Sequence, residues 1–250
     1  TITSLTTLNS WGTVKPSLII VRETGLPLVP RIILTISIRL IFFVVFPFIN
    51  LLTKRKNNYI RKAIHLSWRF FVFCMSALDL ISIKIINFEE LKNSRGKIIV
   101  ANHPSLIDIV ILISLIPQAD CIVKSSLANN FFMKGIIKSA YVINSINVNE
   151  LFLSCAESLK KGNNLIIFPE GTRTVPGQKS NISRGAAHIA IHSHSDILPI
   201  KISCNPPALL KGQKWYHVAD RKLEFILEIK PTVRIDRYLD KDQEKSIRAR

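Results

Sequence analysis

The sequence predicts an α/β protein with a mostly parallel sheet flanked by helices. Short apolar runs rich in β-branched residues alternate with segments of helical periodicity, which is typical of parallel strands joined by helices. Two of the runs, 97–101 and 165–167, lead directly into polar sequences. Open α/β sheets carry their chemistry at such strand ends. The 250 residues suffice for one domain with an ample core and leave length for an appendage.

Composition divides the chain into four parts. Residues 1–30 mix Ser, Thr, Gly and Pro and are expected to form an extended lead-in. Residues 31–80 hold two apolar stretches separated by a basic cluster, and residues 81–238 carry the alternating strand and helix pattern. Residues 239–250 are a charged tail, expected to be a solvated helix or disordered. The first residues lack the signal-peptide pattern, so no cleavable leader is expected.

The first apolar stretch, residues 32–52, would reach about 31 Å as a helix, which matches the hydrocarbon thickness of a bilayer. Arg39 opposes a simple span, because an arginine near the bilayer centre costs at least ~2.5 kcal/mol unless it snorkels or pairs. Basic residues at 54–62 mark a cytoplasmic turn facing anionic lipid, and a second apolar stretch follows at 70–75. Three arrangements fit: a spanning helix followed by an interfacial one, a hairpin in one leaflet, or two core helices of a soluble domain.

The elements of the main domain follow from periodicity. Residues 81–88 alternate isoleucine with polar residues, the period of a half-buried strand. Pro104 suits the first position of a helix that continues to about Leu115, and Lys160-Lys161-Gly162 is a stop signal for a helix beginning at Glu150. Further helical segments are expected from Phe131 and from Ser183. The remaining expected strands are 97–101, 121–124, 141–143, 165–168, 197–203, 223–230 and 232–235.

The run 97–101 ends in Asn102-His103-Pro104-Ser105-Leu106-Ile107-Asp108. On one continuous helix His103 and Asp108 would lie roughly 140° apart, so they can meet only if His103 lies outside the helix and folds back. The carboxylate would then fix the imidazole tautomer and leave the other ring nitrogen as a base. Taken alone, the pair also fits a capping histidine and an aspartate that complements the helix dipole.

A second motif favours the chemical interpretation. The strand at 165–167 leads into Phe168-Pro169-Glu170-Gly171-Thr172-Arg173. Together the two stretches resemble the lysophosphatidate (1-acyl-glycerol-3-phosphate) acyltransferase family, whose N-H-x4-D block corresponds to Asn102, His103 and Asp108. Its F-P-E-G-T-R block is intact here. Lys124, followed by Gly135, matches the lysine of an intermediate block, and Leu198-Pro199-Ile200 matches the last block. The family usually closes its intermediate block with an arginine, where this chain has Asn144.

The resemblance implies acyl transfer from a thioester to the free hydroxyl of lysophosphatidate, giving phosphatidate, with His103 and Asp108 as catalytic residues. It implies acceptor binding by Lys124, Glu170, Gly171, Thr172 and Arg173. It also implies a membrane-anchoring helical hairpin over residues 31–80. No metal or prosthetic group is implied, since acyl-coenzyme A or acyl carrier protein brings the activated donor. The expected partner is an anionic bilayer surface, with the catalytic domain on the cytoplasmic side of the inner or plasma membrane.

Two other functions stay open. The same chemistry can serve another lysophospholipid or a specialised lipid, because Asn144 removes an expected phosphate contact. A non-catalytic membrane-binding module would keep the fold without the reaction. Within the catalytic interpretation, Ser105 is a rival nucleophile, although the G-x-S-x-G elbow is absent from the sequence.

Charge and composition bound the partners. Lys and Arg number 34 against 17 acidic residues, giving +17, and 48% of residues are hydrophobic. Such charge suits nucleic acid or an anionic membrane, and the long apolar stretch favours the membrane. The sequence has no zinc spacing, RNP-like block or phosphate-loop glycine pattern, so no nucleic-acid partner is expected.

Cysteines and histidines outside the motifs predict no further site. The four cysteines are scattered without C-x-x-C and are expected to be reduced, buried thiols. His188 is interpreted as a helix-face histidine. His192 and His194 have no third ligand nearby in the sequence, so no metal site is assigned.

Overall fold

The computed structural model describes residues 58–124, 142–144, 147–174, 177, 181–210 and 221–239. Predictions for the lead-in, the first apolar stretch, the Phe131 segment and the charged tail lie outside these residues. None of the helices in the described ranges is both long enough and apolar enough to cross a membrane. The helices are α3 (Asn58–Ala77), α4 (Phe88–Lys92), α5 (Asp108–Leu115), α8 (Val148–Lys160) and α9 (Gly185–Ser193).

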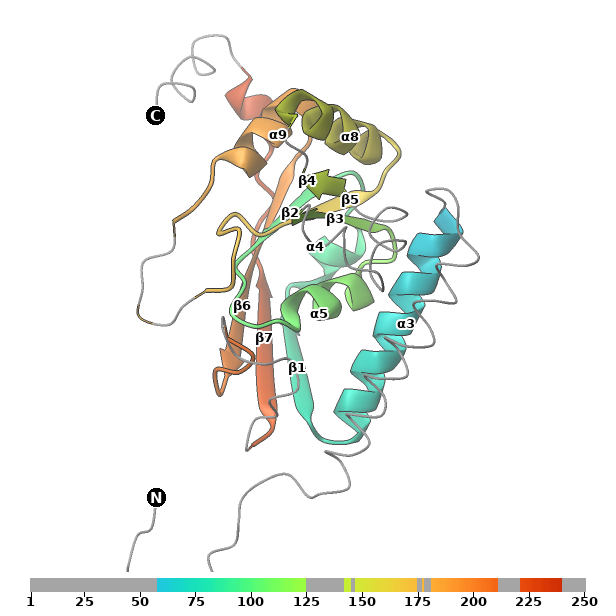
Figure 1. The fold of residues 1–250 in the computed structure, drawn as a ribbon, viewed down its shortest axis with the longest axis vertical. Coiled ribbons are helices and arrows are strands. Elements are labelled where there is room, and N and C mark those ends of the chain that lie inside the picture. Colours follow the sequence, from blue (N-terminus) through green and yellow to red (C-terminus); the bar gives the residue numbers. More distant parts are fainter. Residues whose placement is uncertain are drawn as a thin grey trace, which may run out of the picture.

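In the described ranges, a seven-stranded sheet forms the centre of the domain (Figure 1). Its strands are β1 (Ile81–Ile86), β2 (Ile98–Ala101), β3 (Ala119–Lys124), β4 (Val142–Asn144), β5 (Asn164–Ile167), β6 (Ile197–Asn205) and β7 (Leu223–Ile229). The order across the sheet is β1-β7-β6-β2-β5-β3-β4, and every neighbouring pair is parallel except β6 and β7. The predicted α/β class with a mostly parallel sheet is confirmed.

Two hydrophobic clusters cover opposite faces of the sheet, because successive side chains of a strand point to opposite sides. Along β2, Ile99 and Ala101 join the cluster that includes α3 and α5, whereas Ile98 packs with α8 and α9. In β5, Leu165 and Ile167 face the α8 and α9 side. Burial on both faces explains why these strands read as continuous apolar runs rather than as alternating ones.

The helix α3 has an inner and an outer apolar face. Ile64, Trp68, Phe71 and Met75 recur at helical spacing and belong to the same core as β1, β2 and α5. Leu66, Phe70 and Phe73 project away from that core, with 51%, 65% and 65% of their surface exposed. The part of the predicted hairpin that the structure describes therefore packs on the sheet domain with one side and leaves the other side bare.

A buried ion pair attaches the start of α3 to the sheet. The Arg61 guanidinium donates from Nε to Asp120 Oδ1 at 2.7 Å and from Nη2 to Oδ2 at 3.0 Å. Ser158 of α8 donates its hydroxyl to the same carboxylate. Only 7% of the Arg61 side chain and 1% of the Asp120 side chain are exposed, so this bidentate contact lies in a dry environment.

Three differences between the predicted and the observed elements have a local cause in the structure. The strand predicted over 81–88 ends at Ile86, because Asn87 adopts a left-handed conformation (φ 62°) that turns the chain into the short helix α4. The segment 232–235 is not a strand beside β7: Val233 makes an isolated bridge with Ile197, and a 3₁₀ helix follows at Ile235–Tyr238. Ile235 buries its side chain in the cluster that includes residues of α8 and α9.

The third difference is the start of the helix after the first motif. Pro104 does not open the helix, which begins at Asp108. Residues 104–107 form a turn instead. The Asp108 carboxylate accepts the main-chain N–H of Ser105 at 2.7 Å, so this side chain closes the turn before the helix starts.

Candidate active site

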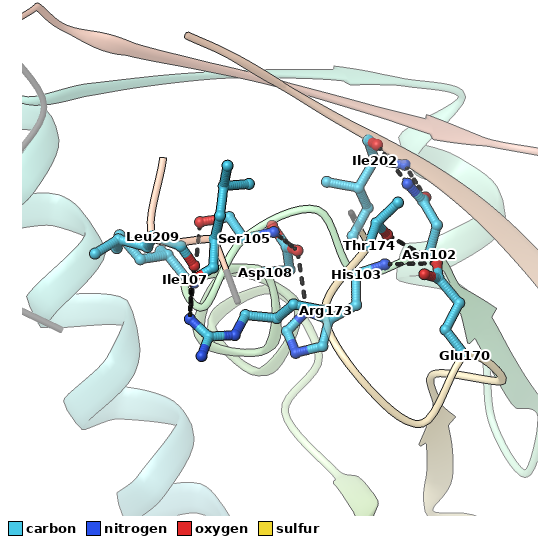
Figure 2. Close-up of polar contacts among 11 residues, drawn as sticks. Asn102, His103, Ser105, Ile107, Asp108, Glu170, Arg173, Thr174, Ile202 and Leu209 are labelled. Carbon is cyan, nitrogen blue, oxygen red and sulfur yellow. Dashed lines mark hydrogen bonds and ion pairs between the residues drawn. The ribbon is translucent and has the colours of Figure 1, made fainter. Parts of the chain in front are cut away.

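The two motifs meet at the carboxyl ends of β2 and β5, which are adjacent parallel strands. The chain leaves β2 through Asn102 and His103, and it leaves β5 through the loop that begins at Phe168. Figure 2 shows His103, Asp108, Glu170 and Arg173 around this junction. The sequence analysis placed each motif at the end of a strand, which the structure confirms, and the structure adds that the two strand ends are adjacent.

His103 and Asp108 form a hydrogen-bonded pair. Asp108 Oδ2 lies 3.1 Å from His103 Nδ1, and the Asp108 side chain is fully buried. His103 precedes the helix and folds back onto its first residue, as the five-residue spacing required. When Nδ1 donates its proton to the carboxylate, Nε2 carries the free lone pair and can accept a proton. The imidazole keeps 16% of its side chain exposed, so the pair combines a buried carboxylate with an accessible base.

The environment of Asp108 disfavours its ionised form. Burial is the largest influence and raises the pKa of the carboxyl group, and the nearby charge of Glu170 raises it further. Hydrogen bonds from His103 and from the Ser105 N–H act in the opposite direction but do not offset burial. Both hydrogen bonds are made to Oδ2. Oδ1 is the one buried side-chain nitrogen or oxygen atom in the described ranges that has no hydrogen-bond partner. The carboxylate is therefore a strong acceptor toward the imidazole.

The backbone and ring of His103 are held from the second motif. The His103 N–H donates to Glu170 Oε1 at 3.3 Å, and the His103 carbonyl accepts from the Thr174 N–H at 2.7 Å. The Thr174 hydroxyl donates to the same Glu170 oxygen at 2.9 Å. The Phe168 ring stacks on the imidazole with centroids 4.2 Å apart. Glu170, predicted to bind substrate, thus contacts the histidine backbone, and the contributions of Phe168 and Thr174 were not foreseen.

Arg173 is oriented by the chain that follows β6. Its Nη1 donates to the carbonyl oxygens of Leu209 at 2.7 Å and Leu210 at 2.9 Å. Gly171 and Thr172 are exposed at the tip of the loop, and Gly171 has a positive φ of 61° that a side chain would strain. The structure brings these three residues to the same loop as Glu170, beside His103.

Lys124 lies farther along the sheet edge. It is the last residue of β3, which adjoins β5, and its backbone is in register with Asn144 of β4. The residue that stands where the family usually has an arginine is therefore the neighbour of Lys124 in the sheet. The following glycine of that block, Gly135, lies outside the described residues.

Ser105 does not suit the role of nucleophile. Its side chain is fully buried, and its Oγ accepts the Ile107 N–H at 3.4 Å. A buried hydroxyl that supports a turn cannot reach a substrate carbonyl. The arrangement favours the histidine base over a serine nucleophile.

The remaining histidines and cysteines lie elsewhere. His188, His192 and His194 are exposed around α9, and no group of His, Cys, Asp or Glu side chains suited to a metal ion occurs in the part of the chain that the structure describes. All four cysteines lie in the described ranges and none forms a disulfide; Cys121 and Cys155 are buried and the other two are partly buried. Burial raises the pKa of Cys121 to about 12, which keeps that thiol protonated.

Comparisons with known proteins agree with the two motifs. Residues 82–203 match the family model described as Acyltransferase. The chain is 32% identical over 152 residues to a 1-acyl-sn-glycerol-3-phosphate acyltransferase from Helicobacter pylori, covering 58% of this chain and 59% of that protein. It is 30% identical over 125 residues to the protein of the same name from Cocos nucifera, covering 47% of this chain and 40% of that protein. The matches thus span less than two thirds of these relatives' length.

A solved structure shares the fold. The crystal structure of the 1-acyl-sn-glycerophosphate (LPA) acyltransferase PlsC from Thermotoga maritima superposes with a TM-score of 0.65 at 20% sequence identity, over 89% of this chain and 95% of that one. The segment that matches the family model, residues 82–203, contains both motifs, from Asn102 through Arg173. Residues 82–203 of the chain therefore match the acyltransferase family, and the relatives matched here carry the name 1-acyl-sn-glycerol-3-phosphate acyltransferase.

Proposed function

We propose that the protein transfers a fatty acyl group from a thioester donor to the free hydroxyl of lysophosphatidate, giving phosphatidate. The observation that carries the proposal is the contact between His103 Nδ1 and the buried Asp108 carboxylate, which leaves Nε2 as a base at the strand edge. The names of the matched relatives support the same reaction.

The reaction needs one base and an activated donor. His103 Nε2 takes the proton of the acceptor hydroxyl as that oxygen attacks the thioester carbonyl. The tetrahedral intermediate then expels the thiolate, which receives the proton from the imidazolium, so that ester and free thiol are the products. Asp108 stabilises the imidazolium, and a positioned base of this kind contributes about 10²- to 10⁴-fold in rate. A thioester is already activated, so a covalent acyl-enzyme is not required, and acyl-coenzyme A or acyl carrier protein supplies the acyl chain.

The F-P-E-G-T-R loop is the proposed acceptor site. Arg173 uses Nη1 for the Leu209 and Leu210 carbonyls, which aims the guanidinium while Nε and Nη2 remain for a phosphate. Gly171 and Thr172 offer an exposed loop tip that a head group can approach. Glu170 holds the loop against His103 through its contact with the His103 N–H. Lys124 is proposed to assist the phosphate from the end of β3.

A different acceptor is the second candidate. Asn144 is in register with Lys124, so an amide stands at the sheet position where an arginine would add positive charge. Another lysophospholipid, or a specialised lipid with a free hydroxyl or amine, would need less positive charge there.

The proposed setting is a membrane surface. Leu66, Phe70 and Phe73 form an exposed apolar row on α3, with Arg69 also exposed on the helix. Such a row with basic residues suits an interface with anionic lipid. With residues 31–80 as a membrane-anchoring hairpin, the catalytic domain would lie on the cytoplasmic face of the inner or plasma membrane.

The test uses detergent-solubilised protein with acyl-coenzyme A and lysophosphatidate, following thiol release and the lipid product. His103→Ala should abolish product formation. His188→Ala, which changes an exposed histidine of α9, should match the wild type. Faster turnover on neutral lysolipids would favour the second candidate. Equal turnover by His103→Ala and the wild type would refute the histidine mechanism.

A further inference from the structure

The carboxamide of Asn102 continues the pairing of β2 with β6 beyond the last residue of β2. The parallel ladder between these strands ends with Ala101 beside Ile200. One residue later, Asn102 Nδ2 donates to the Ile202 carbonyl at 2.8 Å, and the Ile202 N–H donates to Asn102 Oδ1 at 2.7 Å (Figure 2). The side chain thus supplies the donor and acceptor that a further strand residue would have supplied.

This contact is made where the chain must leave the sheet. The Ile202 side chain is buried, with 2% of its surface exposed, so its main-chain groups lie where water is scarce. Asn102 satisfies both of them while its own backbone is released to turn toward the active site. The sheet pairing therefore ends without leaving unpaired polar groups beside Ile202.

The next residue along the chain is His103. Its main-chain N–H and C=O are bound by Glu170 and Thr174 from the neighbouring loop, but these partners lie on a loop, whereas Ile202 lies in the sheet interior. Asn102 is the point at which the histidine backbone is joined to the rigid sheet. A tilt of the peptide between residues 102 and 103 would move the imidazole away from Asp108, whose Oδ2 lies 3.1 Å from Nδ1.

We propose that Asn102 is a positioning residue for His103: its two hydrogen bonds to Ile202 set the direction in which the chain leaves β2 and thereby the contact between His103 and Asp108. The effect on turnover rests on the proposed acyl transfer, whereas the effect on the His103 contact does not. Asn102 itself has no role in binding substrate in this proposal.

The chain offers a matched control in Asn164. Its Oδ1 accepts the Lys97 N–H at 3.1 Å and its Nδ2 donates to the Ser94 carbonyl at 3.0 Å, so this buried carboxamide also makes a donor and an acceptor contact with the main chain. Asn164 is the first residue of β5, at the opposite end of the strands from His103. Its removal should disturb stability in a similar way without touching the site.

The first experiment compares Asn102→Ala and Asn164→Ala by acyl-transfer kinetics, thermal unfolding and low-field proton NMR. The Nδ1 proton of His103, assigned by its loss in His103→Ala, reports the contact with Asp108 without any substrate. Asn102→Ala should lose or broaden this resonance and lower kcat by about 10²-fold with little change in KM, because misplacement by about 1 Å can cost this much. Asn164→Ala should keep the resonance and the wild-type kcat.

A second variant, Asn102→Asp, guards against a failure of Asn102→Ala to fold. One oxygen of the new carboxyl group can accept the Ile202 N–H, but the other can donate to the Ile202 carbonyl only when protonated. The ratio of its activity to that of the wild type should therefore rise as the pH falls. A ratio that does not change with pH would count against the proposal.

The outcomes separate this inference from the proposed function. An intact resonance and unchanged kcat in Asn102→Ala would overturn it, and so would equal losses in Asn102→Ala and Asn164→Ala. If the wild type transfers no acyl group to any acceptor tested while the resonance is lost only in Asn102→Ala, the proposed function fails and the positioning of His103 by Asn102 stands.

Discussion

Replacing Asp108 by asparagine should separate activity from stability. The amide is nearly isosteric with the carboxyl group, and its oxygen can still accept the Ser105 N–H that Asp108 Oδ2 accepts at 2.7 Å. The same oxygen would also face His103 Nδ1, because Asp108 Oδ2 makes both contacts, and the NH2 group would take the position of Oδ1. The hydrogen bond from Nδ1–H can then persist, but a neutral amide does not stabilise the imidazolium that forms when Nε2 takes a proton. Because the loss of the orienting carboxylate to an amide costs about 10⁴-fold in a serine protease triad, we expect kcat to fall by about 10²- to 10⁴-fold.

The same substitution should raise the stability of the folded protein near neutral pH. The pKa of Asp108 is raised above its ordinary value of 3.8 mainly by burial, so folding favours the protonated form. In the pH window between 3.8 and the raised pKa, the native state binds more protons than the unfolded state, and stability falls as the pH rises. Above that window the ionised carboxylate lowers the free energy of unfolding by a constant amount. Asp108→Asn removes this penalty, so the variant should unfold at a higher temperature than the wild type near neutral pH.

Thermal unfolding and acyl transfer measured on the same preparations test the predicted gain in stability and the predicted loss of activity. The difference in Tm between Asp108→Asn and the wild type should grow from acid to neutral pH and then level off. Asp120→Asn is the contrasting variant, because it leaves the buried Arg61 guanidinium without its carboxylate and should lower Tm. A clear loss of stability in Asp108→Asn at neutral pH would show that its hydrogen bonds outweigh burial and would refute the reasoning.

Three further changes test the fold and its surface. Arg61→Met should lower the free energy of unfolding by about 3–5 kcal/mol in urea titrations, because it leaves the buried Asp120 carboxylate without its cationic partner. An unchanged urea midpoint would contradict this. Replacing Phe70 and Phe73 by serine should weaken co-sedimentation with anionic vesicles while Tm is maintained, since both rings are exposed; vesicle binding equal to that of the wild type would exclude this face. Arg173→Lys should raise KM for lysophosphatidate more than KM for the donor, because a lysine cannot hold two carbonyls and a phosphate together.

The architecture could be predicted from the sequence because the local sequence patterns agree with the observed burial along most of the domain. The runs that became β2 and β5 are apolar on both faces, and the sheet order buries both faces. The spacing of His103 and Asp108 also determined that the histidine had to precede the helix, and the structure confirms this geometry. Such features depend on a few neighbouring residues and can be predicted from them.

Other features depend on partners far along the chain. Asn102 donates a hydrogen bond to the carbonyl of Ile202, 100 residues later, and Arg173 donates one to the carbonyl of Leu209, 36 residues later. Neither contact leaves a periodic signal, because a main-chain partner can belong to any residue type. The early end of β1 had a local cause in the left-handed Asn87, but asparagine adopts that conformation only in some contexts.

The position of β7 has a consequence for synthesis on the ribosome. β1 pairs in parallel with β7, from Ile81 beside Leu223 to Ile86 beside Glu228, and Asn87 bonds to Ile229, 142 residues away. β7 is also the antiparallel neighbour of β6, so one late strand closes two open edges. At a synthesis rate of about 5–20 residues per second, β1 waits many seconds for its partner. Until then the edges of β1 and β6 stay unpaired, and nascent chains that stop before Leu223 should be the species most in need of a chaperone.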